Sequence, residues 1–377
     1  MPDKSGIWII LFVTVLTLGG CSGRAQSDVA STEKQDYTGD ACRWTDSLIS
    51  AMTVEQRIGQ LFMPAVYAFP DEATLASVAE YAAKDFVGGI ILLKGDSRGA
   101  RSIADTLRKI SPDPGMWIAI DAETGLAMRL SDAPAIPSAY TLGKTADDQK
   151  VYEYGRSLAR HCRDEGVNMV LGPVLDVESS PGGFIGRRSF GGDPAKVGCL
   201  GVAYARGLED GGIVSVAKHF PGHGCADEDS HKNLAIIAKP LSYLQKYALP
   251  PFREYISAGL SSVMVGHLAV TAIDPQMRSA ALSEAVITDL LRNDMGFKGL
   301  VLTDALNMNG ARRGSGKDID PSVAAILAGA DMILAPPDLR TGIEAVKQAF
   351  EAGIITDSLL NDRLRHIFLC KYRFLRN

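Results

Sequence analysis

The stretch Ile213-Val-Ser-Val-Ala-Lys-His-Phe-Pro-Gly-His-Gly224 is the most informative segment of the chain for its fold. It begins as a short apolar run with the length and composition of a buried strand. The run ends in a Lys-His pair and a Pro/Gly turn, and an Asp229-Ser-His231 loop follows, so three of the six histidines fall within thirteen residues. A buried strand with so many titratable groups at its C-terminal end is typical of the rim of an active site.

Similar apolar runs recur along the chain, with helical patterns between them. The eight predicted strands are Gln60–Ala65, Gly89–Leu93, Trp117–Asp121, Asn168–Leu171, Ser215–His219, Ser262–Gly266, Gly299–Thr303 and Asp331–Ala335. The predicted helices include Leu75–Tyr81, Ile103–Ile110, Gln149–Asp164, Ala195–Glu209, Tyr243–Ser257, Ser283–Leu291 and Asp320–Leu327. Continuous apolar strands that alternate with helices indicate a parallel sheet covered on both faces. Eight such units over about 300 residues predict an α/β fold, a single-domain (β/α)8 TIM-type barrel, rather than a doubly wound sheet.

Ionisable residues follow five of the eight predicted strands. They are Asp121, Asp176, the Lys218-His219 pair, His267 and Asp304. In a barrel the C-terminal ends of the strands meet at one mouth, where the chemistry is carried out. Packing alone does not explain apolar runs that each finish in an ionisable residue, so we expect these side chains to share one site.

Composition limits the class of ligand. The chain has 377 residues, of which 46% are hydrophobic and 22% charged, with a net charge of −5 and a pI near 5.7. This balance has no electrostatic footprint for nucleic acid. No Gly-x-Gly-x-x-Gly follows the first strand, so dinucleotide binding has no support. The expected ligand is a small molecule or a neutral polymer.

The N-terminus reads as an export signal. Lys4 is followed by an apolar segment from Ile7 to Leu18, which is short for a membrane span. Leu18-Gly-Gly-Cys21 resembles a bacterial lipobox, which predicts a lipoprotein signal peptide over residues 1–20 and lipidation of Cys21. A flexible tether over 21–42 and a folded domain over 43–377 would follow. An ordinary signal peptide with a chance cysteine is the alternative. Ser22 indicates outer-membrane sorting, so we expect a lipid-anchored protein of the bacterial cell envelope, on its periplasmic or its surface face.

Six segments carry a resemblance to a known family. They are Met52-Thr-Val-Glu-Gln-Arg-Ile-Gly-Gln-Leu61, Gly88-Gly-Ile-Ile-Leu-Leu-Lys94, Ile185-Gly-Arg-Arg-Ser-Phe-Gly191, Lys218-His-Phe-Pro-Gly-His-Gly224, Gly299-Leu-Val-Leu-Thr-Asp-Ala-Leu-Asn-Met308 and Gly353-Ile-Ile-Thr-Asp-Ser-Leu-Leu-Asn-Asp-Arg363. With them the chain resembles glycoside hydrolase family 3, in its single-domain β-N-acetylhexosaminidase branch.

The resemblance implies a role for each matching residue. Asp304 would be the catalytic nucleophile and His231 the general acid/base, with Asp229 as its partner. The residues implied to bind the sugar before the scissile bond are Asp121, Arg129, Arg188, Lys218 and His219. The implied activity is exo-β-N-acetylglucosaminidase, with an N-acetylglucosamine-containing oligosaccharide or a muropeptide as substrate.

The residues themselves suit this chemistry. Retaining hydrolysis needs a carboxylate near the anomeric carbon and an acid beside the leaving oxygen. Asp304 directly follows a predicted strand, and a histidine with a pKa of about 6.5 transfers protons near neutrality. Asp229 faces the same way as His231 in an extended loop and would orient its ring. The competing interpretations are a helix-capping Asp304, a solvated polar loop around His231 and a structural salt bridge for Arg188.

A zinc site is the metal-based alternative. His219, His223 and His231 are spaced irregularly, Pro221 and Gly222 interrupt the segment, and no cysteine or carboxylate set completes a tetrahedron. Besides Cys21 the chain has five cysteines whose spacing fits no metal site. We therefore predict no metal and no cofactor.

The sequence departs from the family pattern in Asp121-Ala-Glu-Thr-Gly-Leu-Ala-Met-Arg129. Leu126 and Met128 stand where relatives usually have Arg and Gln, which affects the neighbouring subsite and the substrate preference. Three alternatives stay open: a β-glucosidase, a glycoside phosphorylase of the same family, or a sugar-binding lipoprotein without turnover. The oligomeric state cannot be read from the sequence.

Overall fold

Parallel strands and the helices that follow them form the protein, as the computed structural model describes it for residues 39–111, 115–144, 147–178, 182–224, 234–308, 310–311 and 319–376. Seven strands lie in one sheet in the order β10-β8-β6-β5-β4-β3-β2, and every registered pair is parallel. Their bounds are β2 Ala65–Ala68, β3 Gly89–Gly95, β4 Trp117–Ile120, β5 Met169–Val170, β6 Val214–Phe220, β8 Ser262–Val265 and β10 Leu300–Thr303.

Each of the eight predicted strands corresponds to a strand in the structure, and the sheet is curled. The first predicted strand divides at Pro64 into β1 (Phe62–Met63) and β2, because proline has no N–H to donate to a neighbouring strand. β1 pairs in parallel with β11 (Ile333–Leu334), and an isolated bridge joins Leu302 of β10 to Met332. The predicted α/β class is therefore confirmed, with a curled parallel sheet.

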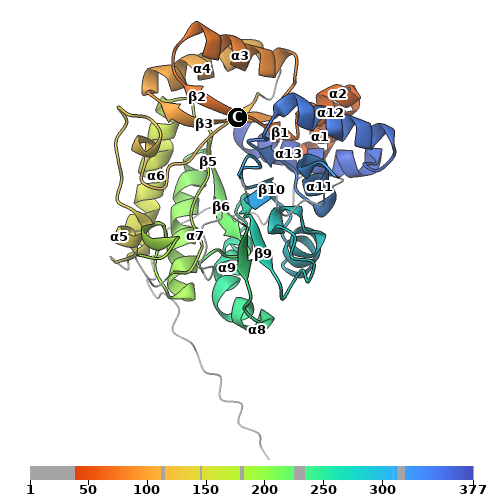
Figure 1. Ribbon diagram of the computed structural model, residues 1–377. Coiled ribbons are helices and arrows are strands. Elements are labelled where there is room, and N and C mark those ends of the chain that lie inside the picture. The colour runs from red at the N-terminus through yellow and green to blue at the C-terminus, as the bar shows by residue number, and fades with distance from the viewer. Residues whose placement is uncertain are drawn as a thin grey trace, which may run out of the picture. The chain divides into compact units, whose positions relative to one another are not determined.

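Helices surround the strands (Figure 1). The α-helices are α1 Gly39–Ala51, α2 Val54–Gly59, α3 Glu72–Ala83, α4 Ser97–Ile110, α5 Ala139–Gly143, α6 Asp148–Asp164, α7 Pro194–Asp210, α8 Leu241–Tyr243, α9 Pro250–Ser257, α11 Pro321–Ala328, α12 Leu339–Glu351 and α13 Asp357–Leu375. Several begin where a side chain accepts an orphan backbone N–H, as Asp71 does for α3 and Asp96 for α4. The predicted helix Ser283–Leu291 is a π-helix over Ala285–Asp294.

The sheet and the helices pack closely on their shared face. Residues of β4, β6 and β8 are all buried, as expected for strands covered on both sides. Gly99 on α4 allows the helix to approach β2, since a Cβ there would lie 1.9 Å from the carbonyl oxygen of Ala68. This packing fixes the strand ends that carry the site.

A small parallel pair, β7 (Ala235–Ile237) with β9 (Leu268–Val270), was not predicted, because three-residue strands are too short to show a sequence period. In the part of the chain that the structure covers, no helix combines the length and the apolar character that a membrane crossing needs. The predicted signal peptide and Cys21 lie outside the described residues.

Candidate active site

The C-terminal ends of the strands surround a pocket of about 430 Å³. Six of the predicted site residues line it together: Asp121, Arg129, Arg188, Lys218, His219 and Asp304. They come from the ends of β4, β6 and β10 and from two short 3-10 helices, Leu126–Met128 and Gly186–Arg188. Residues more than 180 positions apart in the chain therefore share one cavity.

Lys218 is a buried cation held between two carboxylates. Its Nζ lies 2.8 Å from Asp121 Oδ1 and 2.8 Å from Glu123 Oε1, and only 3% of the residue is exposed. Arg129 donates to the other oxygen of Asp121 over 2.5 Å. Burial alone would lower the pKa of Lys218, but the two carboxylates outweigh it and raise the pKa. The ammonium group is therefore charged at neutral pH and fixed in position.

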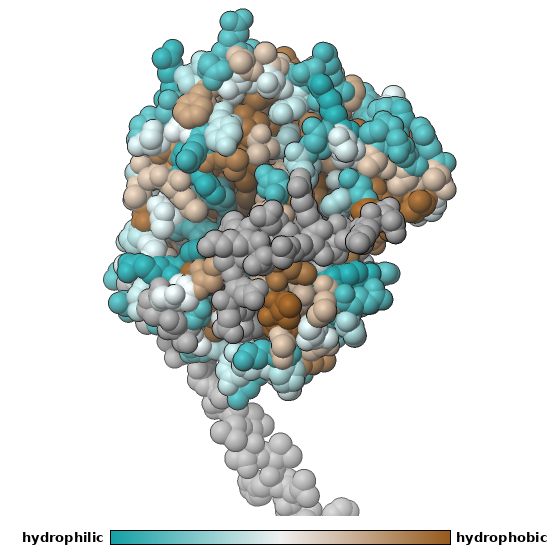
Figure 2. Space-filling model, viewed as in Figure 1, coloured by the Kyte–Doolittle hydropathy of each residue, from teal (hydrophilic) through white to brown (hydrophobic). Residues whose placement is uncertain are grey.

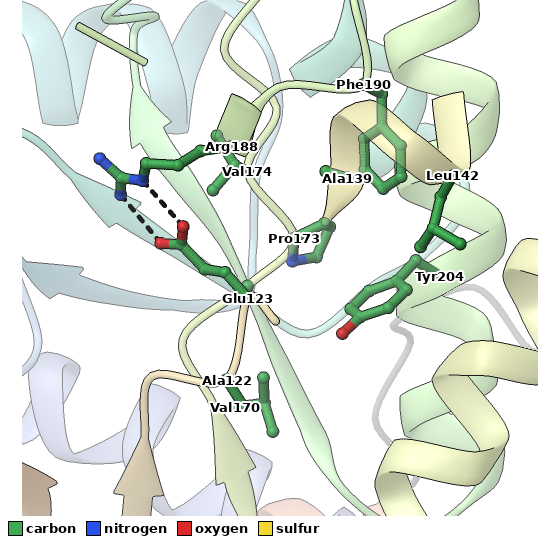
Figure 3. Close-up of a pocket in the computed structure, with 11 residues that line it drawn as sticks. Ala122, Glu123, Ala139, Leu142, Val170, Pro173, Val174, Arg188, Phe190 and Tyr204 are labelled. Atoms are coloured by element: carbon green, nitrogen blue, oxygen red, sulfur yellow. Dashed lines mark hydrogen bonds and ion pairs between the residues drawn. The ribbon is translucent and has the colours of Figure 1, made fainter. Parts of the chain in front are cut away.

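Arg188 extends this network toward the histidines. Its Nε and one terminal nitrogen donate to the two oxygens of Glu123 over 2.8 and 2.9 Å, a planar two-bond pair (Figure 3). The same terminal nitrogen lies 3.2 Å from Nε2 of His219. Burial opposes ionisation of Glu123, yet Lys218 and Arg188 hold its pKa well below the usual range.

Asp176 orients both histidines from beneath. It is fully buried, and it accepts from Nδ1 of His219 over 2.7 Å and from the backbone N–H of His223 over 2.6 Å. These contacts fix the His219 ring, with Nδ1 toward Asp176 and Nε2 toward Arg188. Burial above all lowers the pKa of His223 to about 4, so that ring is neutral near pH 7.

Asp304 stands at the end of β10, facing the same pocket. Its backbone N–H donates to Val265 on β8, and its Oδ1 accepts the N–H of Ala305 over 2.8 Å. Burial would raise its pKa, but His219, His267, Lys218 and the Ala305 N–H together lower it. The carboxylate is therefore ionised at neutral pH, as a nucleophile requires.

His267 supports this corner rather than facing the cavity. It is fully buried, with Nδ1 3.0 Å from the hydroxyl of Ser279 and Nε2 3.1 Å from the carbonyl oxygen of Ala305. Burial lowers its pKa. The sequence marked His267 as a strand-end residue without a role, and its contacts make it part of the scaffold below Asp304.

The sequence predicted the residues that line the pocket, but not which of them contact one another. The predicted roles of the six gathered residues stay predictions, while Asp229 and His231 lie outside the described residues. Glu123, which joins Lys218 to Arg188, was not among the predicted site residues. Its position two residues after Asp121 was the available signal. Asp176 was noted as a strand-end residue, but its contact with His219 depends on tertiary structure.

The geometry of the described residues does not support the zinc-site alternative. Across residues 39–376, apart from the gaps in the description, no three His, Cys, Asp or Glu side chains are grouped to hold a metal ion. Nδ1 of His219 already contacts Asp176. The third histidine of the zinc hypothesis, His231, lies outside the described residues.

A protein-family model and relatives of known name match this chain. The model of the glycosyl hydrolase family 3 N-terminal domain matches residues 53–369. A curated relative, the β-hexosaminidase of Nitrosomonas eutropha, is 34% identical over 257 residues, which are 66% of this chain and 73% of the relative.

Solved structures of glycosidases are also similar to this chain. The glycoside hydrolase family 3 β-N-acetylglucosaminidase of Paenibacillus sp. FPU-7 has a TM-score of 0.79 and 32% identity, over 86% of this chain. This chain spans 63% of that protein's length. The β-N-acetylhexosaminidase of Beutenbergia cavernae has a TM-score of 0.74 and 25% identity, over 85% of this chain and 99% of its own.

Proposed function

The chain belongs to glycoside hydrolase family 3, and on that premise we propose that it is a retaining exo-β-N-acetylglucosaminidase. It would remove terminal N-acetylglucosamine from peptidoglycan fragments or other glycans through a covalent glycosyl-enzyme. The names of the relatives support this substrate class. The observation that carries the proposal is the ionised Asp304 in the same pocket as the paired cations and carboxylates at the ends of β4 and β6.

Sugar binding would use the charged frame of the pocket. Hydroxyl groups both donate and accept, and the frame offers both kinds of partner: Asp121 and Glu123 accept, while Lys218 and Arg188 donate. Each of these groups already has an ionic partner, so the frame is fixed before the sugar arrives. Preorganised groups bind without the entropy cost of ordering long side chains.

In the first step, a carboxylate oxygen of Asp304 attacks the anomeric carbon, and the bond from that carbon to the leaving oxygen breaks. His231 gives its proton to the leaving oxygen. In the second step, a water molecule attacks the same carbon while His231 takes a proton from it, and the bond to Asp304 breaks. The Asp-Ser-His sequence supports Asp229 as the group that orients the His231 ring.

A closed barrel would surround the pocket with strands on every side. We propose that the curled sheet is a complete (β/α)8 barrel. The parallel pairing of β1 with β11, the bridge from Leu302 to Met332, and the single residue between β1 and β2 support it.

The decisive test combines Asp304→Asn and His231→Ala with an aryl N-acetylglucosaminide. Removing the nucleophile would lower kcat by at least about 10³-fold. Azide added to Asp304→Ala would restore turnover and give an α-glycosyl azide, because azide would replace the missing carboxylate on its own face of the sugar. Asp357→Asn, an exposed surface change, is the matched control and keeps full activity. Wild-type rates in both active-site variants would end the proposal.

Two other activities are separated by the same assay. An aryl glucoside tests for β-glucosidase, and added phosphate tests for a phosphorylase that releases a sugar 1-phosphate. Within the described residues, every Lys or Arg that lines the pocket already pairs with a carboxylate, which favours a neutral substrate over an anion. Tight N-acetylglucosamine binding without cleavage of any glycoside would instead indicate a sugar-binding lipoprotein.

We further propose that the protein works in the bacterial cell envelope, anchored to the outer membrane by a lipid on Cys21. Support comes from the apolar segment before Leu18-Gly-Gly-Cys21 and from Ser22. Several acyl chains on one residue anchor a protein stably, whereas a single chain binds only marginally. Such a protein would meet envelope peptidoglycan fragments directly.

A further inference from the structure

Two exposed aromatic rings stand at the end of β2. Tyr67 is 56% exposed and Phe69 46% exposed, and their rings are nearly parallel, at 12°, with centroids 6.5 Å apart. In the described part of the chain no other Phe, Tyr or Trp is as exposed. Leaving two large rings in water forgoes the stability that their burial would give. Such paired exposure commonly marks a binding surface.

The strand pairing brings Tyr67 and Phe69 close to the pocket. Ala68, which lies between them, pairs with Gly95 at the end of β3, after a register shift that interrupts the regular alternation at Tyr67. The N–H of Gly95 donates to the carbonyl oxygen of Arg129 over 3.0 Å, and Arg129 lines the pocket. Val66 and Ala68, on either side of Tyr67, are buried.

Phe69 continues the same surface. Its N–H donates to the carbonyl oxygen of Tyr67 over 2.9 Å, a tight bend that keeps the two rings side by side. Figure 2 shows apolar side chains gathered over the region of β2 and β3, among hydrophilic side chains of the neighbouring helices. The charged pocket and this apolar rim are therefore adjacent but chemically different.

We propose that Tyr67 and Phe69 form a platform for the second pyranose ring of the substrate, next to the one in the pocket. The proposal rests on the function proposed above and specifies its substrate as an oligosaccharide. An exo-acting enzyme holds only the terminal sugar in its pocket, so the rest of the glycan must leave across the rim. Flat aromatic faces contact the C–H face of a pyranose, while its hydroxyl groups stay in water.

The neighbouring charges disfavour an anionic lipid surface as the occupant. Pro70, Asp71 and Glu72 follow the rings directly, and two carboxylates would be repelled by acidic headgroups. A neutral sugar has no such conflict. A second copy of the chain remains a distinct outcome of the test.

The experiment compares two substrates that share the terminal sugar and differ in the second ring. N,N′-diacetylchitobiose has that ring, and methyl β-N-acetylglucosaminide lacks it. An aryl glycoside is unsuitable, because its ring would itself stack on the platform. For the double variant Tyr67→Ala/Phe69→Ala we expect kcat/KM on the disaccharide to fall about 10-fold, through KM, with the methyl glycoside within twofold of wild type. The conservative pair Tyr67→Phe/Phe69→Tyr retains wild-type values.

Ile354→Ala is the matched control, since Ile354 is 58% exposed in the turn between α12 and α13. Equal losses on both substrates, or no loss on either, would overturn the platform. So would a shift from dimer to monomer in the double variant, which would make the rings a contact between copies. If wild type cleaves no N-acetylglucosaminide, the proposed function fails. Calorimetric titration of Asp304→Asn with triacetylchitotriose, with and without the platform change, then still tests the platform: unchanged affinity overturns it.

Discussion

Asp176 is a buried carboxylate that accepts hydrogen bonds from two histidines. It accepts from the ring and backbone of His219 and from the backbone of His223. Burial opposes its ionisation, but these contacts lower its pKa below the ordinary 3.8. A carboxyl group with a depressed folded pKa contributes stability above about pH 4, and loses it as the pH falls through the folded value.

Replacing Asp176 should therefore lower the free energy of unfolding and disturb the orientation of the His219 ring. For Asp176→Ala we expect a loss of about 3–5 kcal/mol in the free energy of unfolding, because three N–H donors are left buried without an acceptor. Urea denaturation at pH 7 measures it. Asp338→Ala, which removes the exposed N-cap of α12, should cost only about 1 kcal/mol. A loss for Asp176→Ala as small as this control would contradict the prediction.

Two buried tyrosines give a second test at this scale. The hydroxyl of Tyr255 lies 2.7 Å from that of Ser215 and donates to its carbonyl over 3.0 Å. The hydroxyl of Tyr204 is buried and, among the described residues, has no hydrogen-bond partner (Figure 3). We expect Tyr255→Phe to cost about 1–2 kcal/mol and Tyr204→Phe to be neutral or stabilising. Chemical denaturation of the two variants measures both free energies of unfolding. Equal losses of stability in the two variants would contradict the prediction.

At the scale of elements, strand positions were predictable and strand details were not. A buried parallel strand is a continuous apolar run, and this signal located the seven strands of the main sheet together with β1 and β11. The break at Pro64 depends on which neighbour pairs on each side of it. The π-helix Ala285–Asp294 was predicted as an ordinary helix, because its i→i+5 hydrogen bonds lengthen each turn by less than one residue and ten residues are too few to show the difference.

Helix α13 contributes a buried lysine whose charge should make stability depend on pH. Lys371 donates to Gln60 and to the carbonyl oxygen of Gly115, with no carboxylate partner in the structure as described, and burial lowers its pKa to about 7. Between about pH 7 and 10.5 the unfolded chain holds a proton that the folded protein lacks. Stability should therefore rise with pH across this window, by up to about 1.4 kcal/mol per unit.

The variant Lys371→Met isolates this effect. Its free energy of unfolding should lack the rise that wild type shows between pH 7 and 10, because methionine fills the same volume without a proton to release. Denaturation curves at several pH values measure the difference between the two proteins, which cancels the titration of all other groups. Parallel pH profiles for both proteins would show that the ammonium group stays charged in the folded state.

At the scale of the whole molecule, the site depends on which strand ends meet. Lys218 contacts Asp121 across 97 residues of chain, and Arg188 contacts Glu123 across 65. The barrel hypothesis predicted that such residues would converge, because parallel strands end at one edge. It could not predict which carboxylate would pair with which cation, since the pairing is set by side-chain reach after the sheet has curled.

The predicted lipid anchor also concerns the whole molecule. Cys21→Ser should move the protein from the detergent phase to the aqueous phase in a Triton X-114 partition, and should abolish labelling by palmitate. The folded domain should keep the proposed activity on small glycosides, because the change lies 18 residues before α1. Detergent-phase partitioning of Cys21→Ser would indicate that the membrane attachment lies elsewhere.

Helices α1 and α13 bring the two ends of the described chain together. Trp44 packs edge-on against Phe368 and Tyr372, and the guanidinium of Arg376 lies over the Trp44 ring. A short linker would therefore join residues 39 and 376 into a circle, and a new start could be opened in a surface turn without loss of the core. A fluorescent reporter fused after Asn377 would, for the same reason, lie near α1 and the N-terminal ends of the strands, away from the pocket at their C-terminal ends.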